Sequence, residues 1–287
     1  METPIASAGN ITNAVINSVS KRKKGTISGL PTGFSELDRI LSGLNKGNMI
    51  TVAGHPGIGT TAFALRLAEH LSIDNNIPAL FFSMELEKEK LIERMLMGRA
   101  KVNLRKANEG DLEANDWDII QNTASVFIKK PMFIDDTNRL TFSELKENTK
   151  EFKTSHNIQC IIVDYLQAMR AEKSIDLSST DYADIAGGLK WMALELNIPI
   201  LLLVHLSFDL IRADEEGCQP RVADFGETII VERYADVVML LHRENYYGYC
   251  APDSNSAEIY ITKNRNGPTG MVKLSFHDQY ARFENLI

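Results

Sequence analysis

Cysteine is scarce in this sequence, and its scarcity excludes two classes of protein. Only Cys160, Cys218 and Cys250 occur among 287 residues, and their positions match no metal-ligand spacing. Cys160 lies inside an apolar run, which is typical of a small core residue. So few cysteines argue against a disulfide-stapled secreted domain and against a zinc module. They indicate a reduced, cytoplasmic protein.

Long apolar runs and an excess of basic residues are also missing. No stretch of about 18 apolar residues occurs, so we expect no membrane span. Residues 1–20 lack the basic start and apolar centre of a signal peptide. The net charge of −7 gives no sign of nucleic-acid binding. It leaves such binding open, because a ring can line its channel with loops while its outer surface stays acidic.

The polar residues 1–28 differ from the rest of the chain. They end in the basic run from Lys21 to Lys24, and two interpretations of the segment stay open. It is either a solvated tail or a linker helix whose stripe of Ile11, Val15 and Ile16 docks on a neighbouring subunit. From residue 29 the pattern becomes regular and shows no repeat, so residues 29–287 are predicted to form one domain.

Apolar periodicity predicts alternating strands and helices through this domain. Runs 159–163 and 199–204 are continuously apolar, as in parallel strands that are covered on both faces. We therefore predict an α/β fold with a mostly parallel central sheet, helices on both faces and antiparallel strands at the C-terminal edge. The predicted helices are 34–41, 88–102, 112–128, 141–155 and 181–196. The other predicted strands are 49–53, 78–83, 131–135, 237–241, 258–263, 271–276 and 282–286.

The stretch that organises the domain is a strand, a glycine-rich turn and an amphipathic helix. This order is the context of a phosphate-binding loop, where backbone N–H groups and the helix N-terminus hold an anion. The spacing fits G-x-x-x-x-G-K-[ST] at every fixed position except one, because Thr60 stands where the lysine belongs. The predicted nucleotide-binding residues are Gly54, His55, Pro56, Gly57, Ile58, Gly59, Thr60 and Thr61.

The missing lysine predicts weakened chemistry more than lost binding. One charge-assisted contact is worth ~1.5–3 kcal/mol in binding, whereas losing one transition-state donor lowers a rate by ~10²–10³-fold. The backbone amides, Mg²⁺ and groups from a neighbouring subunit remain able to hold ATP. The alternative is that residues 54–61 form a plain glycine turn.

Two carboxylates follow apolar strands and are predicted to complete the site. Asp164 ends the run 161–163, where a carboxylate beside a phosphate loop holds Mg²⁺ together with the Thr61 hydroxyl. Glu85 follows the strand 78–83 and is placed to orient the attacking water. The alternative roles are a turn aspartate and an ordinary polar residue at a strand end.

Three further residues are candidates with open alternatives. His205 follows a strand and is either a phosphate-sensing contact or a structural histidine. Lys263 and Arg265 point the same way on an extended segment. They are either a pair of fingers on a neighbour's nucleotide or part of a solvated hairpin tip.

Taken together, six runs resemble one known family. The sequence from about residue 26 to the end resembles the C-terminal RecA-like ATPase domain of DnaB-type replicative hexameric DNA helicases. The runs are Thr-Gly-Phe-Ser-Glu-Leu-Asp at 32–38, Phe-Ser-Met-Glu at 82–85, Phe-Ile-Asp-Asp at 133–136, Val-Asp-Tyr-Leu-Gln at 163–167, Lys-Asn-Arg-Asn-Gly-Pro at 263–268 and Gln-Tyr-Ala-Arg-Phe at 279–283.

The resemblance implies a hexameric ring with ATP sites between neighbours and single-stranded DNA in the channel. It implies that Glu85 is the catalytic carboxylate, that Asp164 serves Mg²⁺, and that Lys263 and Arg265 reach into the adjacent site. A helicase loader or primase is the implied protein partner. His205 stands where the family has glutamine.

The sequence departs from the family at the DNA-binding loop as well as at Thr60. Gly226 takes the place of an arginine before Glu227, and Ile229 that of a glycine, which weakens contact with a phosphate backbone. We expect an ATP-dependent DNA helicase of this type, as a stand-alone motor domain with impaired hydrolysis. The alternative is a non-catalytic or weakly catalytic nucleotide-binding ring subunit that regulates DNA replication. A weaker third interpretation is a RecA/KaiC-like ATPase outside replication, against which the tail at 263–283 argues.

Overall fold

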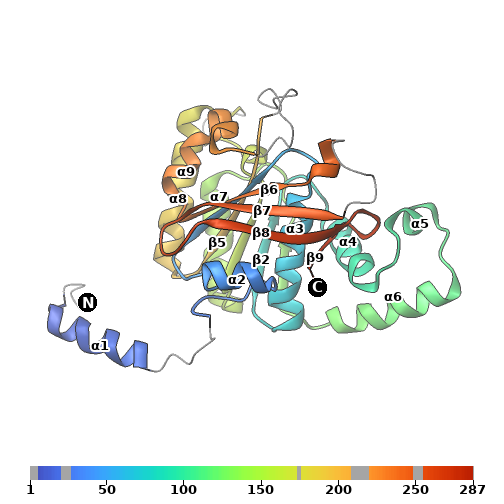
Figure 1. Cartoon of the computed structure of the whole chain (residues 1–287), viewed down its shortest axis with the longest axis horizontal. Helices are drawn as coiled ribbons and strands as arrows, with labels where there is room; N and C mark the ends of the chain where they lie inside the picture. Colours follow the sequence, from blue (N-terminus) through green and yellow to red (C-terminus); the bar gives the residue numbers. More distant parts are fainter. Residues whose placement is uncertain (1–5, 21–26, 173–175, 208–219, 248–254, 287) are drawn as a thin grey trace.

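One nine-stranded sheet runs through the molecule, with strand order β3-β2-β4-β5-β1-β6-β7-β8-β9 (Figure 1). The computed structural model describes residues 6–20, 27–172, 176–207, 220–247 and 255–286. The first six strands in this order pair in parallel, and β7, β8 and β9 are added antiparallel at one edge. The predicted fold class is therefore confirmed.

The strands lie close to their predicted positions. The parallel strands are β1 (Met49–Gly54), β2 (Ala79–Ser83), β3 (Met132–Asp135), β4 (Cys160–Asp164), β5 (Ile200–His205) and β6 (Val237–His242). The antiparallel strands are β7 (Ser256–Asn264), β8 (Gly270–His277) and β9 (Arg282–Asn285).

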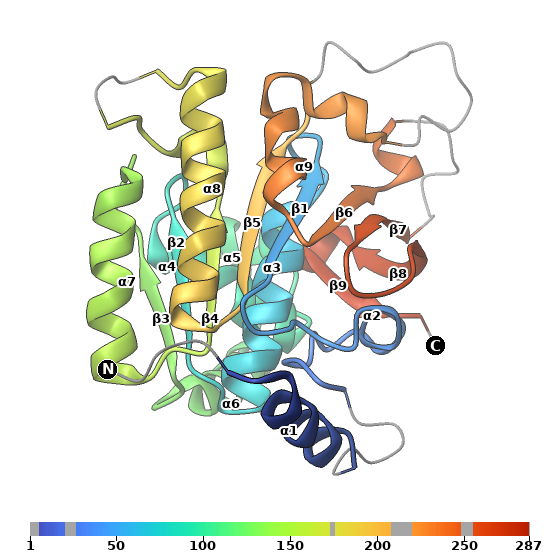
Figure 2. The same cartoon turned by 90° about the vertical axis from the view of Figure 1, so that its left-hand side faces the viewer.

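Helices cover both faces of the sheet (Figure 2). Alternate residues of the central strands point to opposite faces, so Leu201 and Leu203 join one core while Leu202 and Val204 join the other. Because both faces are dry, these strands are continuously apolar. One core contains residues of α2 (Ser35–Leu41), α3 (Thr60–Glu69) and α4 (Lys88–Ala100), and the other contains residues of α7 (Phe142–His156), α8 (Ser179–Leu196) and α9 (Ile230–Tyr234).

Local capping explains why two of these helices begin where they do. The Thr141 hydroxyl accepts from the Glu144 amide, and the Glu144 carboxylate accepts from the Thr141 amide. Ser178 and Asp181 form the same reciprocal pair at the start of α8. Such capping boxes satisfy helix N–H groups that have no intrahelical partner.

The region 104–128 differs from its prediction. A short helix, α5 (Leu104–Glu109), was not predicted, and α6 spans Ala114–Phe127. Of the apolar residues of α6, Ile120 is buried, but Trp117 and Val126 are exposed. The reason is that α6 packs mainly on α4, in a small cluster that also includes residues of α5, while Phe127 at its end packs against the main core. Most of the circumference of α6 therefore faces solvent.

The N-terminal segment contains a helix, α1 (Ala8–Ser20), that lies away from the body of the domain in Figure 1. Its Ile11, Val15 and Ile16 side chains are each more than half exposed. The basic run from Lys21 to Lys24 lies outside the described residues.

Among the cysteines, Cys160 is fully buried, as predicted, and burial raises the pKa of its thiol to about 12. Cys218 and Cys250 lie outside the described part of the chain. None of the helices in the described residues is long and apolar enough to cross a membrane.

Candidate nucleotide-binding site

The glycine-rich loop leaves the carboxyl end of β1 and enters α3 at Thr60. Gly57 and Gly59 have φ angles of 82° and 111°, a region that favours glycine. A Cβ on Gly54 would lie 2.6 Å from Ile58 Cγ2, so a larger residue there would displace the loop. These glycines let the loop fold back tightly over the first turn of α3, where its amides converge with the helix N-terminus.

Two side chains that the sequence did not single out support the loop from the end of β6. The Tyr246 hydroxyl donates to the Pro56 carbonyl at 2.7 Å. The Arg243 guanidinium donates to the Ile58 carbonyl at 3.3 Å and lies 3.8 Å from the centre of the Phe276 ring. No spacing in the sequence links residues so far apart, so only the fold could reveal this support.

The loop borders a cleft of about 560 Å³. Gly57, Thr60 and Thr61 line it, whereas Ile58 and His55 are buried beneath the loop. Thr60 is itself almost fully buried, with its methyl group turned toward Gly54. The loop therefore offers backbone groups and hydroxyls to the cleft, and no cation. The other residues that line the cleft are Pro56, Gly59, Ala62, Glu85, Leu86, Lys90, Glu93, Arg94, Leu104, Asn108, His205, Phe276 and Ala281.

Asp164 lies at the end of β4, beside the loop. Its side chain is buried, and its Oδ1 atom has no hydrogen-bond partner among the described residues. Burial raises the pKa of this carboxyl to about 7, whereas the nearby Thr61 hydroxyl and the charge of Arg94 act in the opposite direction. A buried carboxylate with a free oxygen beside a threonine hydroxyl is a set of hard oxygen donors that fits Mg²⁺.

Glu85 and His205 approach the cleft from neighbouring strands. Glu85 follows β2 and is exposed where it lines the cleft. His205 ends β5 next to Gly54 in the register. Its ring stacks on Tyr165 at 3.8 Å, and Gln167 exchanges two hydrogen bonds with its backbone. Burial lowers the pKa of His205, so its imidazole is neutral at pH 7.

Helix α4 adds cations that sequence reasoning missed. Within the described part of the chain, Lys90 and Arg94 are the lysine and arginine side chains that line the cleft. Lys90 is paired with Glu93 at 2.7 Å. Arg94 forms no ion pair among the described residues, and its charge acts on Asp164. Their i, i+4 spacing on one helix face, just after Glu85, is the signal that could have found them.

Comparison with known proteins agrees with this geometry. The family model described as "DnaB-like helicase C terminal domain" matches residues 29–285. The chain belongs to this family. It is 34% identical over 269 residues to "Replicative DNA helicase DnaB" of Leifsonia xyli, covering 93% of this chain and 58% of that protein. It is 37% identical over 264 residues to the protein of the same name from Pasteurella multocida, covering 91% and 56%.

Two solved structures share the fold. One, described as an ATPase domain, superposes with a TM-score of 0.91 at 28% identity, covering 99% of this chain and 100% of that one. A DnaB-like replicative helicase, described together with its interactions with primase, gives a TM-score of 0.90 at 28% identity and covers 98% and 69%. The chain spans somewhat more than half the length of the curated DnaB relatives it matches.

In this DnaB-like domain, the two residues predicted to contact a neighbour's nucleotide lie away from the cleft. Lys263 is near the end of β7 and Arg265 directly follows this strand, so both lie near the amino ends of β1 and β6. The phosphate loop instead follows the carboxyl end of β1. Lys263 Nζ donates to the Glu232 carbonyl at 2.5 Å, and Arg265 Nη1 lies 3.0 Å from Asp236 Oδ1. Within one chain the structure does not bring either cation to the phosphate loop.

The candidate DNA contacts also lie outside the cleft. Gly226 and Glu227 are in the turn Val222–Ile229, directly before α9. Gly226 has φ 53° and ψ −124°, so it breaks the helical conformation inside this turn. Glu227 is exposed. Two of the side chains that face solvent in this turn are therefore the acidic Glu227 and the apolar Ile229.

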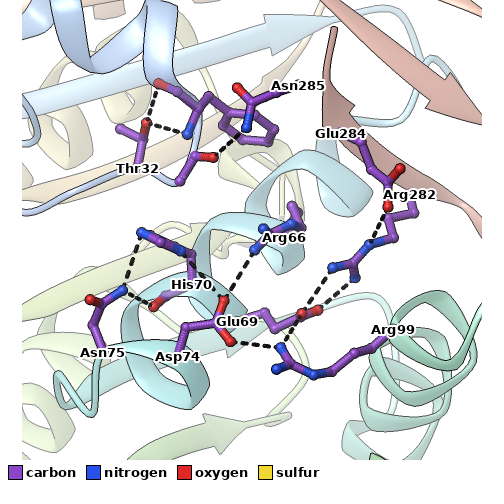
Figure 3. Close-up of polar contacts among 12 residues, drawn as sticks. Thr32, Arg66, Glu69, His70, Asp74, Asn75, Arg99, Arg282, Glu284 and Asn285 are labelled. Atoms are coloured by element: carbon purple, nitrogen blue, oxygen red, sulfur yellow. Dashed lines mark hydrogen bonds and ion pairs between the residues drawn. The ribbon is translucent and has the colours of Figure 1, made fainter. Parts of the chain in front are cut away.

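A buried ion network fixes the helix that carries the phosphate loop (Figure 3). Glu69, at the end of α3, is almost fully buried and accepts from Arg99 of α4 at 2.8 Å. Arg282 of β9 donates to the same carboxylate at 2.8 and 3.0 Å. Because a buried carboxylate needs such partners, α3, α4 and β9 are held together. Arg94 is therefore carried on a helix whose position relative to the loop is fixed.

Proposed function

We propose that this chain is the motor domain of a replicative hexameric DNA helicase that binds Mg-ATP and hydrolyses it slowly. The observation that carries the proposal is the cleft itself. It combines a complete backbone cradle, a buried carboxylate with a free oxygen and an exposed glutamate, yet its loop offers Thr60 in place of a cation. The membership of the DnaB-like family supports the reaction class.

In this proposal the backbone amides of residues 57–61 hold the triphosphate at the N-terminus of α3. Thr61 and Asp164 hold Mg²⁺, which when bound neutralises charge on the β- and γ-phosphates. Because metal ligation requires the ionised carboxylate, Asp164 must lose its proton near neutral pH.

Glu85 orients the water that attacks the γ-phosphate, since it is the carboxylate that follows β2 and lines the cleft. His205 offers a neutral imidazole to the same space. A neutral imidazole has one nitrogen that donates a hydrogen bond and one that accepts. His205 can therefore make a polar contact with a phosphate or a water molecule but brings no charge.

Arg94 supplies part of the charge that the loop lacks. Its guanidinium has no carboxylate partner among the described residues and lines the same cleft as Thr60. Arginine is suited to this task because its planar fork binds phosphate oxygens in pairs. This helix-borne cation supports binding even though the loop position is neutral.

The remaining parts of the proposal need a second copy of the chain. Lys263 and Arg265 lie at the far end of the sheet from their own loop, so they can reach only a neighbour's nucleotide, as in a ring. The exposed apolar stripe of α1 docks on such a neighbour. Single-stranded DNA passes the turn at Gly226 and Glu227 in the channel of a cytoplasmic hexamer, with a loader or primase as partner.

A second candidate function is a nucleotide-binding ring subunit that regulates replication without turnover. Thr60 favours it, because losing a transition-state cation lowers rate more than affinity. Both candidates share the same binding site and differ only in hydrolysis.

Thr60→Lys tests the proposal. We expect it to tighten Mg-ATP binding about ten- to hundredfold and to raise DNA-stimulated ATPase by roughly 10²-fold or more. The measurements are a nucleotide titration and an ATPase assay run side by side. Thr60→Met is the matched control, because methionine is similar in length to lysine but carries no charge. Wild type that hydrolyses ATP as fast as Thr60→Lys would contradict impaired hydrolysis, and wild type that never binds Mg-ATP would contradict the whole proposal.

A further inference from the structure

Asp236 is a buried carboxylate at the end of the sheet opposite the phosphate loop. It directly precedes β6 and is 2% exposed. Its Oδ2 accepts from Lys190 Nζ at 2.6 Å and from the Met49 amide at 2.8 Å, and its Oδ1 pairs with Arg265 Nη1 at 3.0 Å. One carboxylate therefore binds two cations that come from different elements, α8 and the turn after β7.

The two cations are held very differently. Lys190 is the inner one, with its side chain 13% exposed and a further hydrogen bond from Nζ to the Gly47 carbonyl at 2.7 Å. Arg265 is the outer one, 52% exposed, and its side chain makes one contact with the carboxylate. Its backbone amide is fixed separately, to the Asp236 carbonyl at 2.8 Å. The guanidinium can turn away while the chain that carries it stays in place.

Lys190 makes this movement inexpensive in free energy. A folded protein is strongly destabilised when a buried carboxylate loses its only cation. Asp236 keeps Lys190 as a partner when Arg265 turns away, so this cost does not arise. Two cations on one carboxylate also leave one net positive charge at this edge. Lys263 is held by more contacts than Arg265, because its ammonium is 25% exposed and bound to both the carbonyl and the carboxylate of Glu232.

We propose that Asp236 and Lys190 form a holding site for Arg265. Asp236 positions the guanidinium in the free subunit, and Lys190 balances the carboxylate when Arg265 turns to the nucleotide of a neighbouring copy. Asp236 and Lys190 are positioning residues, because neither touches the nucleotide. The inference rests on the proposed function, since it needs Arg265 to act on a neighbour's nucleotide.

The test compares two affinities of the 287-residue chain, one for Mg-ADP with aluminium fluoride and one for Mg-ADP alone. Aluminium fluoride completes a mimic of the transferring phosphoryl group. The affinity with aluminium fluoride divided by the affinity for Mg-ADP alone therefore reports a cation that acts at that position. We expect Arg265→Ala to lower this ratio about ten- to hundredfold. Binding of Mg-ADP alone should stay the same.

Lys190→Met removes the inner cation and leaves Arg265 as the sole cation on Asp236. The guanidinium is then retained in its own subunit, so we expect the ratio to fall roughly tenfold. Adding Asp236→Asn to Lys190→Met removes the charge that retains Arg265. The double variant should recover to within about twofold of wild type, which a merely structural role of Lys190 would not produce.

Two further variants control for folding. Lys153→Met is matched, because Lys153 Nζ donates to the Ile158 carbonyl at 2.7 Å and has no carboxylate partner among the described residues. It should keep the wild-type ratio. Lys190→Gln keeps a hydrogen-bond donor without the charge, and serves if Lys190→Met does not fold by circular dichroism.

The outcomes separate this inference from the function on which it rests. If Arg265→Ala lowers the ratio but Lys190→Met and Lys190→Gln keep it, the holding site is wrong and the proposed finger stands. A double variant that stays as low as Lys190→Met also overturns the holding site. If Arg265→Ala keeps the wild-type ratio, the finger is wrong, and the holding site with it.

Discussion

Two buried aspartates at opposite ends of the sheet face opposite electrostatic conditions. Asp164, at the carboxyl end of β4, has an oxygen without a hydrogen-bond partner among the described residues. Asp236, at the amino end of β6, binds two cations and a backbone amide. Burial raises the pKa of Asp164 to about 7. The contrast teaches that equal burial does not imply equal roles.

The roles of the two carboxylates differ because Asp164 lacks a partner for one oxygen, whereas both oxygens of Asp236 are paired. For Asp164, desolvation outweighs the opposing effects of the Thr61 hydroxyl and the Arg94 charge and favours the protonated acid, so this carboxylate is suited to bind a further cation. Asp236 is already balanced, so it stabilises the fold and positions its partners. An incomplete buried carboxylate beside a phosphate loop is therefore the stronger indication of a metal site.

The largest effect is expected from Asp236→Ala. This substitution leaves Lys190 with no counter-charge in a mostly buried position, which costs about 3–5 kcal/mol in the free energy of unfolding. Urea denaturation measures the loss. Asp184→Ala, at an exposed position on α8, is the control and should change stability by less than about 0.5 kcal/mol. Equal losses for the two variants would contradict the balanced state of Asp236.

Asp164→Asn tests whether the Asp164 carboxylate is unbalanced, through the dependence of the unfolding free energy on pH. The folded pKa of about 7 lies above the unfolded value of 3.8, so the native state holds this proton more tightly. Stability from this group is complete below about pH 4 and falls as pH rises toward 7, by roughly 4 kcal/mol in total. Asparagine has no such proton. The wild-type curve of unfolding free energy against pH should therefore fall more steeply than that of Asp164→Asn, and parallel curves would show that Asp164 is already balanced.

Arg94→Gln gives the smallest of the three effects and sharpens the account of the cleft. Loss of one charged contact should weaken Mg-ATP binding by about 1.5–3 kcal/mol. If Arg94 stands in for the loop lysine, the loss should be smaller in a Thr60→Lys background. Titrations of both single variants and the double variant measure this coupling. Equal losses in both backgrounds would mean that Arg94 acts independently of residue 60.

Much of the fold could be predicted because its signals are local or nearly so. Continuous apolar runs place β4 and β5 at the centre, and the predicted helix 141–155 agrees with α7 to within one residue at each end. Helix α5 was missed because six residues give too little periodicity. The sequence predicted α6 but not its surroundings, so the exposure of Trp117 is visible in the tertiary structure alone.

The candidate site divides in the same way. Glycine spacing and the strand ends at Asp164 and His205 are visible along the chain. The contributions of Arg94 and Asp236 are not, because their meaning lies in what approaches them from other elements. The roles of Glu85, Lys263 and Gly226 in the reaction stay predictions.

By itself the sequence determined the α/β order, the phosphate loop and its missing lysine, because each depends on residue types at fixed short spacings. Only the tertiary structure decided which charges are balanced, because burial and counter-charge are properties of space. Residues 49, 190, 236 and 265 meet at one end of the sheet although they are far apart in sequence.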